Sequence, residues 1–316
     1  MQLPYSGARV LHVARFDTRY HRSGGALSTA LSSLGCEVTA IEERTRGPLF
    51  HRDLPARIAA ALRTTRPDLV LVFEGELLEP DQIDQLRPQS LARWVNWFPE
   101  GPHRLGLSLD LGRAYHRCFV FDSSMVAAHR AAGHHADYLP EGFEPSYHRP
   151  LDPGQPPLSR LAFVGSHDEP LRVAALSAVT DLGLEIWGPG WPTGPLYGDD
   201  FVRAFARSEV ALNVHRYFGE PAEMGRYGTG PNRRVFEIAA IGTVQLCDAK
   251  ADIARHFRAD LEIVLFRDRD ELRAKASWLL GAPADRQAIA ERARKRSLDE
   301  HTWRHRLDEL LFRTFR

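Results

Sequence analysis

GTGPNRRVFEIAAIG occupies residues 228–242, and a short apolar run, Thr243–Cys247, follows it directly. Gly228 and Gly230 predict a pliable loop that can approach a ligand closely, and Pro231 suits the first position of a helix because its missing N–H has no partner to lose there. Apolar residues at helical spacing within Asn232–Ile241 predict a helix with one face on a core. A glycine loop, a helix and a strand in this order indicate one repeat of a parallel α/β sheet.

The same alternation of short apolar runs and amphipathic segments extends over the whole chain. Runs of four to six β-branched and aromatic residues separated by helical patterns are typical of a parallel sheet covered on both faces. A glycine-containing loop at Ser23–Gly25 and a helix to Leu34 are predicted after the first strand, and a helix is predicted over Ala251–Phe257. The predicted strands are Arg9–Ala14, Cys36–Ile41, Leu69–Phe73, Trp94–Trp97, Cys118–Phe121, Leu161–Val164, Leu184–Trp187, Val210–Val214, Thr243–Cys247 and Glu262–Phe266.

A proline-rich stretch divides the chain into two halves. Pro140, Pro145, Pro150, Pro153, Pro156 and Pro157 fall within it, and proline removes backbone donors, so neither a helix nor a central strand is expected there. The sequence therefore predicts a Rossmann-like N-terminal domain over residues 1–145, a linker over 146–158 and a Rossmann-like C-terminal domain over 159–300. Residues 301–316 are predicted to form a separate basic, amphipathic helix.

Composition places the chain among globular proteins. Apolar residues make up 43% and charged residues 26%, while Lys+Arg and Asp+Glu both number 41, which argues against a protein that coats nucleic acid. The scattered Cys36, Cys118 and Cys247 form no CxxC pair and fit a reducing compartment, and no His/Cys cluster has zinc-site spacing. Without a signal-like Met1–Ser6 or a membrane-length apolar run, a cytoplasmic protein with no integral membrane contact is expected.

Charged residues at the start of the 232–241 helix could bind a diphosphate. The helix dipole and Arg233 or Arg234 both favour an anion there, and Glu237 lies one turn further on, where it could accept hydrogen bonds from ribose hydroxyls. The alternative is a surface ion pair between Arg233 and Glu237, which stand four residues apart.

A family resemblance favours the first interpretation. NRRVFEIAAIGTVQLCD, residues 232–248, resembles the nucleotide-sugar segment of the CgeB-like (spore maturation) glycosyltransferases, which are GT-B enzymes related to retaining nucleotide-sugar transferases. The resemblance implies two Rossmann-like, doubly wound parallel-sheet domains that face a cleft, an N-terminal acceptor domain and a C-terminal donor domain. Further segments in the family's order are FVGS at Phe163–Ser166 with Arg172 nearby, WGPGW at Trp187–Trp191, ALNVHR at Ala211–Arg216, EIVLF at Glu262–Phe266 and HTWRHR at His301–Arg306.

The resemblance implies roles for individual residues of the C-terminal half. Gly165 and Ser166 would contact phosphate or acceptor through backbone N–H groups near Arg172, and Asn232 with Arg233 or Arg234 would meet the pyrophosphate. Glu237 would hold the ribose. The loop containing Trp187, Gly188 and Gly190 would lie near the nucleobase, although turn chemistry alone explains it equally well. Asn213 and His215 end a strand at the cleft, and His215 is either a sugar or phosphate contact or a hydrogen-bonded structural histidine.

One position departs from the pattern of the retaining relatives. Many of them carry two glutamates separated by seven residues, and counting back from Glu237 by that interval reaches Thr229. Glu220 and Glu223, in the loop HRYFGEPAEMGRYG, could substitute if that loop folds over the donor.

The N-terminal half offers candidates for the acceptor side. WVNWFPEGP, residues 94–102, resembles the family's aromatic strand followed by an acidic-proline loop, with Glu100 in place of the more usual aspartate. Because the carboxyl ends of parallel strands face the ligand, Glu100 and then His21 are the candidate catalytic residues. The other candidates are Asp17, Glu74, Glu76 and His103. The resemblance also implies that the helix at 301–316 packs back on the N-terminal domain; a membrane-surface or nucleic-acid role is the alternative.

The resemblance therefore implies a hexosyltransferase-like, retaining enzyme that uses a UDP-, GDP- or dTDP-sugar and has no tightly bound cofactor. No metal is expected, because no DxD-like pair follows a strand and Asp199–Asp200 and Asp268–Asp270 look like helix caps. The acceptor could be a saccharide, a protein, a metabolite or a modified nucleobase. Two other functions fit the same scaffold: a nucleotide-sugar epimerase and a non-catalytic protein that binds a nucleotide or sugar.

Overall fold

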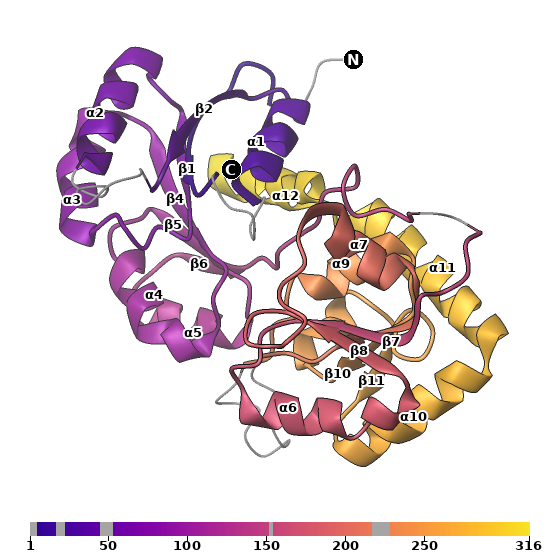
Figure 1. Ribbon diagram of the computed structural model, residues 1–316. Coiled ribbons are helices and arrows are strands. Elements are labelled where there is room, and N and C mark those ends of the chain that lie inside the picture. Colours follow the sequence, from indigo (N-terminus) through magenta and orange to yellow (C-terminus); the bar gives the residue numbers. More distant parts are fainter. Residues whose placement is uncertain (1–4, 17–22, 45–52, 152–153, 217–227) are drawn as a thin grey trace. The chain divides into compact units, whose positions relative to one another are not determined.

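The computed structural model describes residues 5–16, 23–44, 53–151, 154–216 and 228–316. The chain divides into two compact units, each built around its own parallel sheet (Figure 1). Unit 1 comprises Met1–Glu141 and Trp303–Arg316, and unit 2 comprises Gly142–Thr302. The boundary between the two units therefore lies at Glu141–Gly142, before the expected linker over residues 146–158. The described residues of that segment belong to unit 2.

Unit 1 contains a six-stranded sheet in the order β2-β1-β3-β4-β5-β6, with every neighbouring pair parallel. Its strands are β1 Arg9–Ala14, β2 Glu37–Glu42, β3 Leu69–Phe73, β4 Arg93–Phe98, β5 Arg117–Val120 and β6 Ala136–Tyr138. Its helices are α1 Ser23–Ser33, α2 Leu54–Thr65, α3 Pro80–Leu86, α4 Leu105–Gly112, α5 Ser124–Ala131 and α12 Trp303–Phe315, with short 3-10 turns at Arg87–Gln89 and Pro102–Arg104.

Separate apolar cores cover the two faces of this sheet, which explains why the inner strand β3 is apolar along its whole length. Residues of α2 to α5 supply one core. The other is supplied by α1 and α12, which lie side by side in Figure 1 and bury Leu27 and Leu31 against Leu307 and Leu311. The C-terminal helix thus completes the core of unit 1.

The predicted glycine loop at Ser23–Gly25 is wrong, because these residues form the first turn of α1. A Cβ atom at Gly24 would lie 2.4 Å from the backbone oxygen of Arg15, immediately after β1. Glycine is needed here for the close approach of a helix to a strand end, not for a turn.

A buried histidine in β1 makes unit 1 sensitive to acid. His12 is fully buried, and burial lowers the pKa of its imidazole from 6.5 to about 3. Because this folded-state pKa lies below the unfolded value, the contribution of neutral His12 to the free energy of unfolding is fully present above pH 6.5. That contribution is lost as the pH falls from 6.5 toward 3. Between pH 7.5 and 5 the loss attributable to His12 should be about 2 kcal/mol.

The prediction is that His12→Gln flattens the pH dependence of the free energy of unfolding by that amount. Urea titrations of the wild type and of His12→Gln at pH 7.5 and pH 5 measure this difference in the free energy of unfolding. An identical pH dependence in the two proteins would show that His12 is not the group responsible.

Unit 2 contains a five-stranded sheet in the order β11-β10-β9-β7-β8, also parallel throughout. Its strands are β7 Ser159–Val164, β8 Leu184–Trp187, β9 Ser208–Asn213, β10 Gln245–Asp248 and β11 Val264–Phe266. Its helices are α6 Pro170–Ser177, α7 Gly198–Ala206, α9 Arg234–Ile241, α10 Arg269–Gly281 and α11 Pro283–Glu300, with 3-10 turns at Thr180–Leu182 and Ala251–Arg255. Residues of α6 and α10 pack on one face, and residues of α7 and α9 fill the cores on the other; α11 contributes to both, with Ile289 and Ala290 on the first face and Ala293 on the second.

Several predicted element boundaries in unit 2 shift. The helix expected over Asn232–Ile241 begins at Arg234, so Pro231 precedes it instead of opening it, and Ala251–Phe257 contains a 3-10 turn rather than an α-helix. Asp268 caps α10 as predicted, since its Oδ1 accepts from the Glu271 N–H at 2.8 Å. Asp199–Asp200 does not cap α7: both residues lie in its first turn, after Tyr197 at the cap position.

The segment that follows Gly142 packs into unit 2. Phe143 is fully buried in the α9 and α11 core, and Tyr147 Oη donates to the Gly198 oxygen at 2.5 Å. Pro150 lies against Gly242, where its Cγ would be 3.5 Å from an added Cβ. This packing brings His148, which the sequence did not single out, to the candidate site.

Candidate functional site

The nucleotide-binding candidates gather at the carboxyl edge of the unit 2 sheet. β7, β9 and β10 are neighbours, so Ser166, His215 and Asp248, at or just beyond their ends, meet at one edge. The amino end of α9 lies beside them, because Asn232 bonds to His215. In open parallel sheets, ligands bind at this edge.

Arg172 ties together the loops after β7 and β9. It lies in the first turn of α6 and is only 6% exposed. Its Nη1 donates to the Ser166 oxygen at 3.0 Å, and its Nε donates to the His215 oxygen at 3.3 Å. Asp168 accepts from Ser166 Oγ at 2.6 Å and lies 2.6 Å from Arg216 Nη2. Ser166, Arg172 and His215, expected separately from the sequence, are therefore one connected group.

His215 holds the loop before α9. Its Nδ1 lies 2.6 Å from Asp248 Oδ1, and the Asn232 N–H lies 2.9 Å from its Nε2. The imidazole must therefore carry its proton on Nδ1 and accept at Nε2. Burial lowers the pKa of His215, although Asp248 opposes the shift, which agrees with a neutral ring. This geometry favours the structural alternative for His215, as a residue that positions Asn232.

The only potential metal-binding group among the described residues is formed by His215, Cys247 and Asp248. Both imidazole nitrogens are already hydrogen bonded, and burial raises the pKa of the Cys247 thiol well above its ordinary value. A metal needs an imidazole lone pair and a thiolate, so these residues do not fit one.

A buried amide network supports the same loop. The side chains of Asn213 and Asn232 exchange two hydrogen bonds, of 3.0 and 2.9 Å, and Asn213 Nδ2 also donates to Gln245 Oε1 at 2.8 Å. Gln245 Nε2 in turn donates to the Val235 oxygen of α9 at 3.0 Å. The Asn213 side chain is fully buried, so it positions the loop rather than reaching a ligand.

Glu237 lies inside the protein among cations. It is 5% exposed, and its Oε1 lies 2.7 Å from Arg233 Nε and 3.4 Å from His148 Nε2. Burial alone would raise the pKa of Glu237, but Arg233 and His148 outweigh it and bring that pKa well below its ordinary value. The Arg233–Glu237 pair considered from the sequence exists, but it is not on the surface.

Arg234 has a different environment from Arg233. Its guanidinium lies over the Phe201 ring at 5.4 Å, and within the described part of the chain its buried Nε has no hydrogen-bond partner. Burial and the nearby Arg234 charge lower the pKa of Arg172 to about 10. Two guanidinium groups therefore lie close enough to repel each other, and an anion bound near them would relieve that repulsion.

The WGPGW loop packs on the turn after β7. Gly188 has φ 147°, and a Cβ there would lie 2.0 Å from the Gly165 oxygen, so only glycine fits. Trp191 Nε1 donates to that oxygen at 2.9 Å, and the Gly165 N–H donates to the Trp187 oxygen at 2.8 Å. Gly190 adopts φ 85° in the same loop. The N–H and the oxygen of Gly165 are therefore both hydrogen bonded to this loop, whereas the Ser166 hydroxyl donates to Asp168.

Thr229 lies next to a carboxylate. Its Oγ1 donates to Asp252 Oδ2 at 2.9 Å, and the Asp252 N–H donates to the Thr229 oxygen at 3.0 Å. A buried acidic residue therefore lies one hydrogen bond from the position at which relatives carry their first glutamate. Nothing in the spacing of Asp252 from that position reveals this contact.

The acceptor candidates lie in unit 1, after β3 and β4. Glu100 Oε2 lies 3.4 Å from His103 Nε2, and both side chains are partly exposed. Glu74 lies 3.1 Å from Arg15 Nη1, and Glu76 pairs with both Arg15 and Arg104. The other predicted residues, Asp17, His21, Glu220 and Glu223, lie outside the described residues.

The sequence did not single out Glu43, which connects three loops at the carboxyl edge of the unit 1 sheet. Glu43 follows β2, is fully buried, accepts from the Leu77 N–H at 2.9 Å and lies 3.5 Å from Arg15 Nε. Burial raises the pKa of Glu43, although Leu77 and Arg15 oppose the shift. The available signal was a charged residue at a strand end: Arg15 directly follows the predicted strand Arg9–Ala14, and Glu43 lies two residues beyond the predicted strand Cys36–Ile41.

Comparison with known proteins gives a family match for part of the chain and a fold for all of it. Residues 171–312 match the glycosyl transferase-like family, whereas no curated protein matches the chain. A sucrose-phosphate synthase from Thermosynechococcus elongatus superposes with a TM-score of 0.70 at 13% identity, over 97% of this chain and 98% of that one. The fold is GT-B.

Two further GT-B neighbours cover both chains almost completely. AviGT4, a glycosyltransferase involved in avilamycin A biosynthesis, superposes with a TM-score of 0.66 at 16% identity, over 98% of this chain and 97% of that one. HepE of Anabaena, solved in complex with UDP and glucose, has a TM-score of 0.61 at 11% identity, over 96% and 98%. The predicted fold class, two parallel-sheet α/β domains of GT-B type, is confirmed.

The family match begins in α6 at residue 171 and ends in α12, so it includes most of the candidate nucleotide-binding residues. Among the described residues, no helix has both the length and the apolar character required to cross a membrane.

Proposed function

We propose that this protein is a glycosyltransferase that binds a nucleoside-diphosphate sugar at the carboxyl edge of the unit 2 sheet. The observation that carries the proposal is the setting of two arginines: Arg172 bonds to the loops after β7 and β9, and Arg234 of α9 has a buried Nε without a hydrogen-bond partner among the described residues. A diphosphate bound near these two arginines would relieve the unfavourable interaction between their charges. The family match over residues 171–312 supports the same proposal, as does the similarity to HepE, which was solved with UDP-glucose.

The environments of the candidates suggest separate roles. Arg234 is the better candidate than Arg233 for the diphosphate, because Arg233 is engaged by Glu237. The Ser166 backbone N–H would be a second phosphate contact, on a turn that Arg172 holds through the Ser166 oxygen. Glu237 would accept hydrogen bonds from the ribose hydroxyls, and the WGPGW loop would lie near the base. On the acceptor side, Glu100 and His21 remain the proposed catalytic residues.

The reaction we infer is metal-independent and depends on positioning and on charge. As the bond between the sugar and the diphosphate breaks, negative charge grows on the leaving diphosphate, and guanidinium groups fixed in advance stabilise it. The sugar is proposed to be a hexose and the stereochemical outcome to be retention. Asp252, next to Thr229, would supply the carboxylate that relatives place at that position.

Calorimetry with UDP, GDP and dTDP tests the donor site. One of the three is expected to bind with a Kd on the order of micromolar, about −8 kcal/mol, and EDTA should not weaken it. Glu237→Gln should reduce the affinity about tenfold for ribose-containing nucleotides, since Gln keeps the shape but loses the charge. Lys295→Ala, which removes an exposed cation of α11, should leave it unchanged. Binding of none of the three would exclude the proposal.

Product analysis then separates the possible activities. Transfer requires an acceptor, whereas an epimerase would convert the nucleotide sugar with no acceptor present. A binding protein would return the nucleotide sugar unaltered after prolonged incubation with extracts that supply acceptors. Either of the last two results would replace the glycosyltransferase assignment while retaining the donor site.

A further inference from the structure

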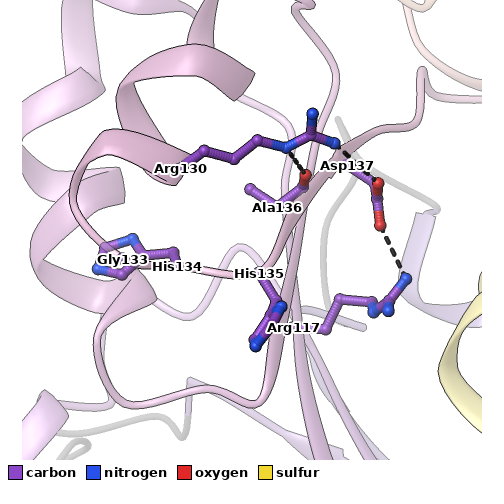
Figure 2. A pocket seen from close by; sticks show the side chains of 7 residues that line it. All are labelled: Arg117, Arg130, Gly133, His134, His135, Ala136 and Asp137. Carbon is purple, nitrogen blue, oxygen red and sulfur yellow. Dashed lines mark hydrogen bonds and ion pairs between the residues drawn. The ribbon is translucent and has the colours of Figure 1, made fainter.

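Unit 1 has an open hollow of about 400 Å³ at the amino edge of its sheet (Figure 2). It is lined by Arg117 at the start of β5, Arg130 near the end of α5, and the residues around the start of the edge strand β6, including His134, His135 and Asp137. Because the strands are parallel, this edge is the opposite one from that at which Glu74 and Glu100 follow β3 and β4. The hollow is thus separate from the proposed acceptor residues.

Two guanidinium groups converge on one carboxylate in this hollow (Figure 2). Arg117 Nη1 lies 2.8 Å from Asp137 Oδ2, and Arg130 Nη2 lies 3.3 Å from Asp137 Oδ1. Arg130 Nε also donates to the Ala136 oxygen at 3.1 Å. Both side chains are therefore held before any ligand arrives, which reduces the entropy that binding would cost.

The charges in and around the hollow do not balance. Besides Arg117 and Arg130, Arg313 of α12 places its Nη1 3.6 Å from Asp137 Oδ1, so three guanidinium groups share one carboxylate. Arg313 also pairs with Glu309, so three guanidinium groups and two carboxylates leave an excess of one positive charge. Each guanidinium has five N–H donors, and the bonds just described use one from Arg117 and two from Arg130.

We propose that this hollow binds a phosphate monoester group. Arginine forks present paired N–H donors that match the oxygens of a phosphate, and the net positive charge favours an oxyanion over a neutral ligand. The imidazoles of His134 and His135 line the same hollow and add further hydrogen-bonding groups. A soluble phosphorylated molecule and a phosphomonoester lipid headgroup offer the same chemistry. The proposal is independent of the donor site in unit 2.

Inorganic phosphate is the simplest probe, and the histidine side chains provide a local readout. Imidazole NMR signals of the full chain would be recorded while phosphate is added, and the His135 signal would be assigned by its loss in His135→Gln. A saturable shift at millimolar phosphate is expected. Because the signal reports on unit 1, phosphate that binds to the arginines of unit 2 does not mimic this result.

Three variants test the assignment of the ligand-binding groups. The double variant Arg117→Ala/Arg130→Ala should weaken the response at least tenfold. Asp137→Asn should strengthen it about fourfold, because it removes a negative charge about 5 Å from the anion in a solvent-exposed site. Arg93→Ala, which removes an exposed cation that does not line the hollow, is the matched control and should change nothing. No saturable shift, or an unchanged one in the double variant, would overturn the proposal.

Vesicle sedimentation distinguishes the two sources of the group. Vesicles of phosphatidylcholine with and without phosphatidic acid would be compared. Binding that needs phosphatidic acid and is lost in the double variant assigns the site to a lipid headgroup. A phosphate response without vesicle binding assigns it to a soluble phosphorylated ligand.

Discussion

Replacing Arg234 by alanine is expected to weaken binding of the nucleoside diphosphate about 10- to 150-fold while leaving binding of the free nucleoside unchanged. A hydrogen bond to a charged group contributes about 1.5–3 kcal/mol, and Arg234 is the guanidinium of the site with an unused buried donor among the described residues. Glu237 keeps Arg233 and His148 in this variant, so no buried carboxylate is left unpaired. Calorimetry with matched diphosphate and nucleoside measures the difference directly.

Two comparisons make the Arg234 result specific. Arg273→Ala removes an arginine of unit 2 that pairs with Asp181, away from the carboxyl edge, and should not change either affinity. Arg233→Ala should weaken nucleoside and diphosphate together, because it releases Glu237 from its closest cation. An equal loss for nucleoside and diphosphate in Arg234→Ala would show that Arg234 acts on the fold of the loop and not on the phosphates.

The largest effect on stability is expected for Trp303→Ala. Trp303 begins α12, is 2% exposed, and packs edge-to-face on Trp97 and Phe73 with ring centroids 5.6 and 6.3 Å away. Replacing a buried aromatic residue by alanine costs about 3–5 kcal/mol, since it leaves a cavity as well as removing buried area. The loss should appear in the urea transition of unit 1, followed by far-UV circular dichroism.

A second residue of the same helix is the control. Phe312 is 48% exposed, so Phe312→Ala should cost less than about 1 kcal/mol. Similar values for the two variants would mean that α12 does not contribute to the core of unit 1 in solution.

Much of the architecture could be predicted from local patterns. The run Leu69–Phe73 is a strand with the predicted bounds, because a strand covered on both faces must be apolar along its whole length. The cap at Asp268 was predictable for a similar reason, since it involves only the first turn of its own helix. Predicted element boundaries were wrong where a contact with another segment decides the structure. At Gly24, for example, the start of α1 packs closely against the backbone of Arg15.

The candidate site was predicted less completely. The four-residue spacing predicted an ion pair between Arg233 and Glu237, but it could not show that the Glu237 carboxylate of this pair is buried. Asn232 was expected to meet the pyrophosphate, but its N–H donates to His215, which comes from another strand end. His148 and Asp252 were missed because each approaches through a separate segment of the chain.

By itself, the sequence determined the two α/β sheets, the order of their elements and the residue types that can bind a diphosphate. These properties depend on periodicity and composition over short stretches, where burial and backbone conformation are set by near neighbours. Only the tertiary structure decided which polar groups are already satisfied and which remain available. Hydrogen bonding and charge at Arg234, His215 and Glu237 depend on side chains brought within a few ångströms by strands and helices far apart in the chain, and no local pattern encodes those distances.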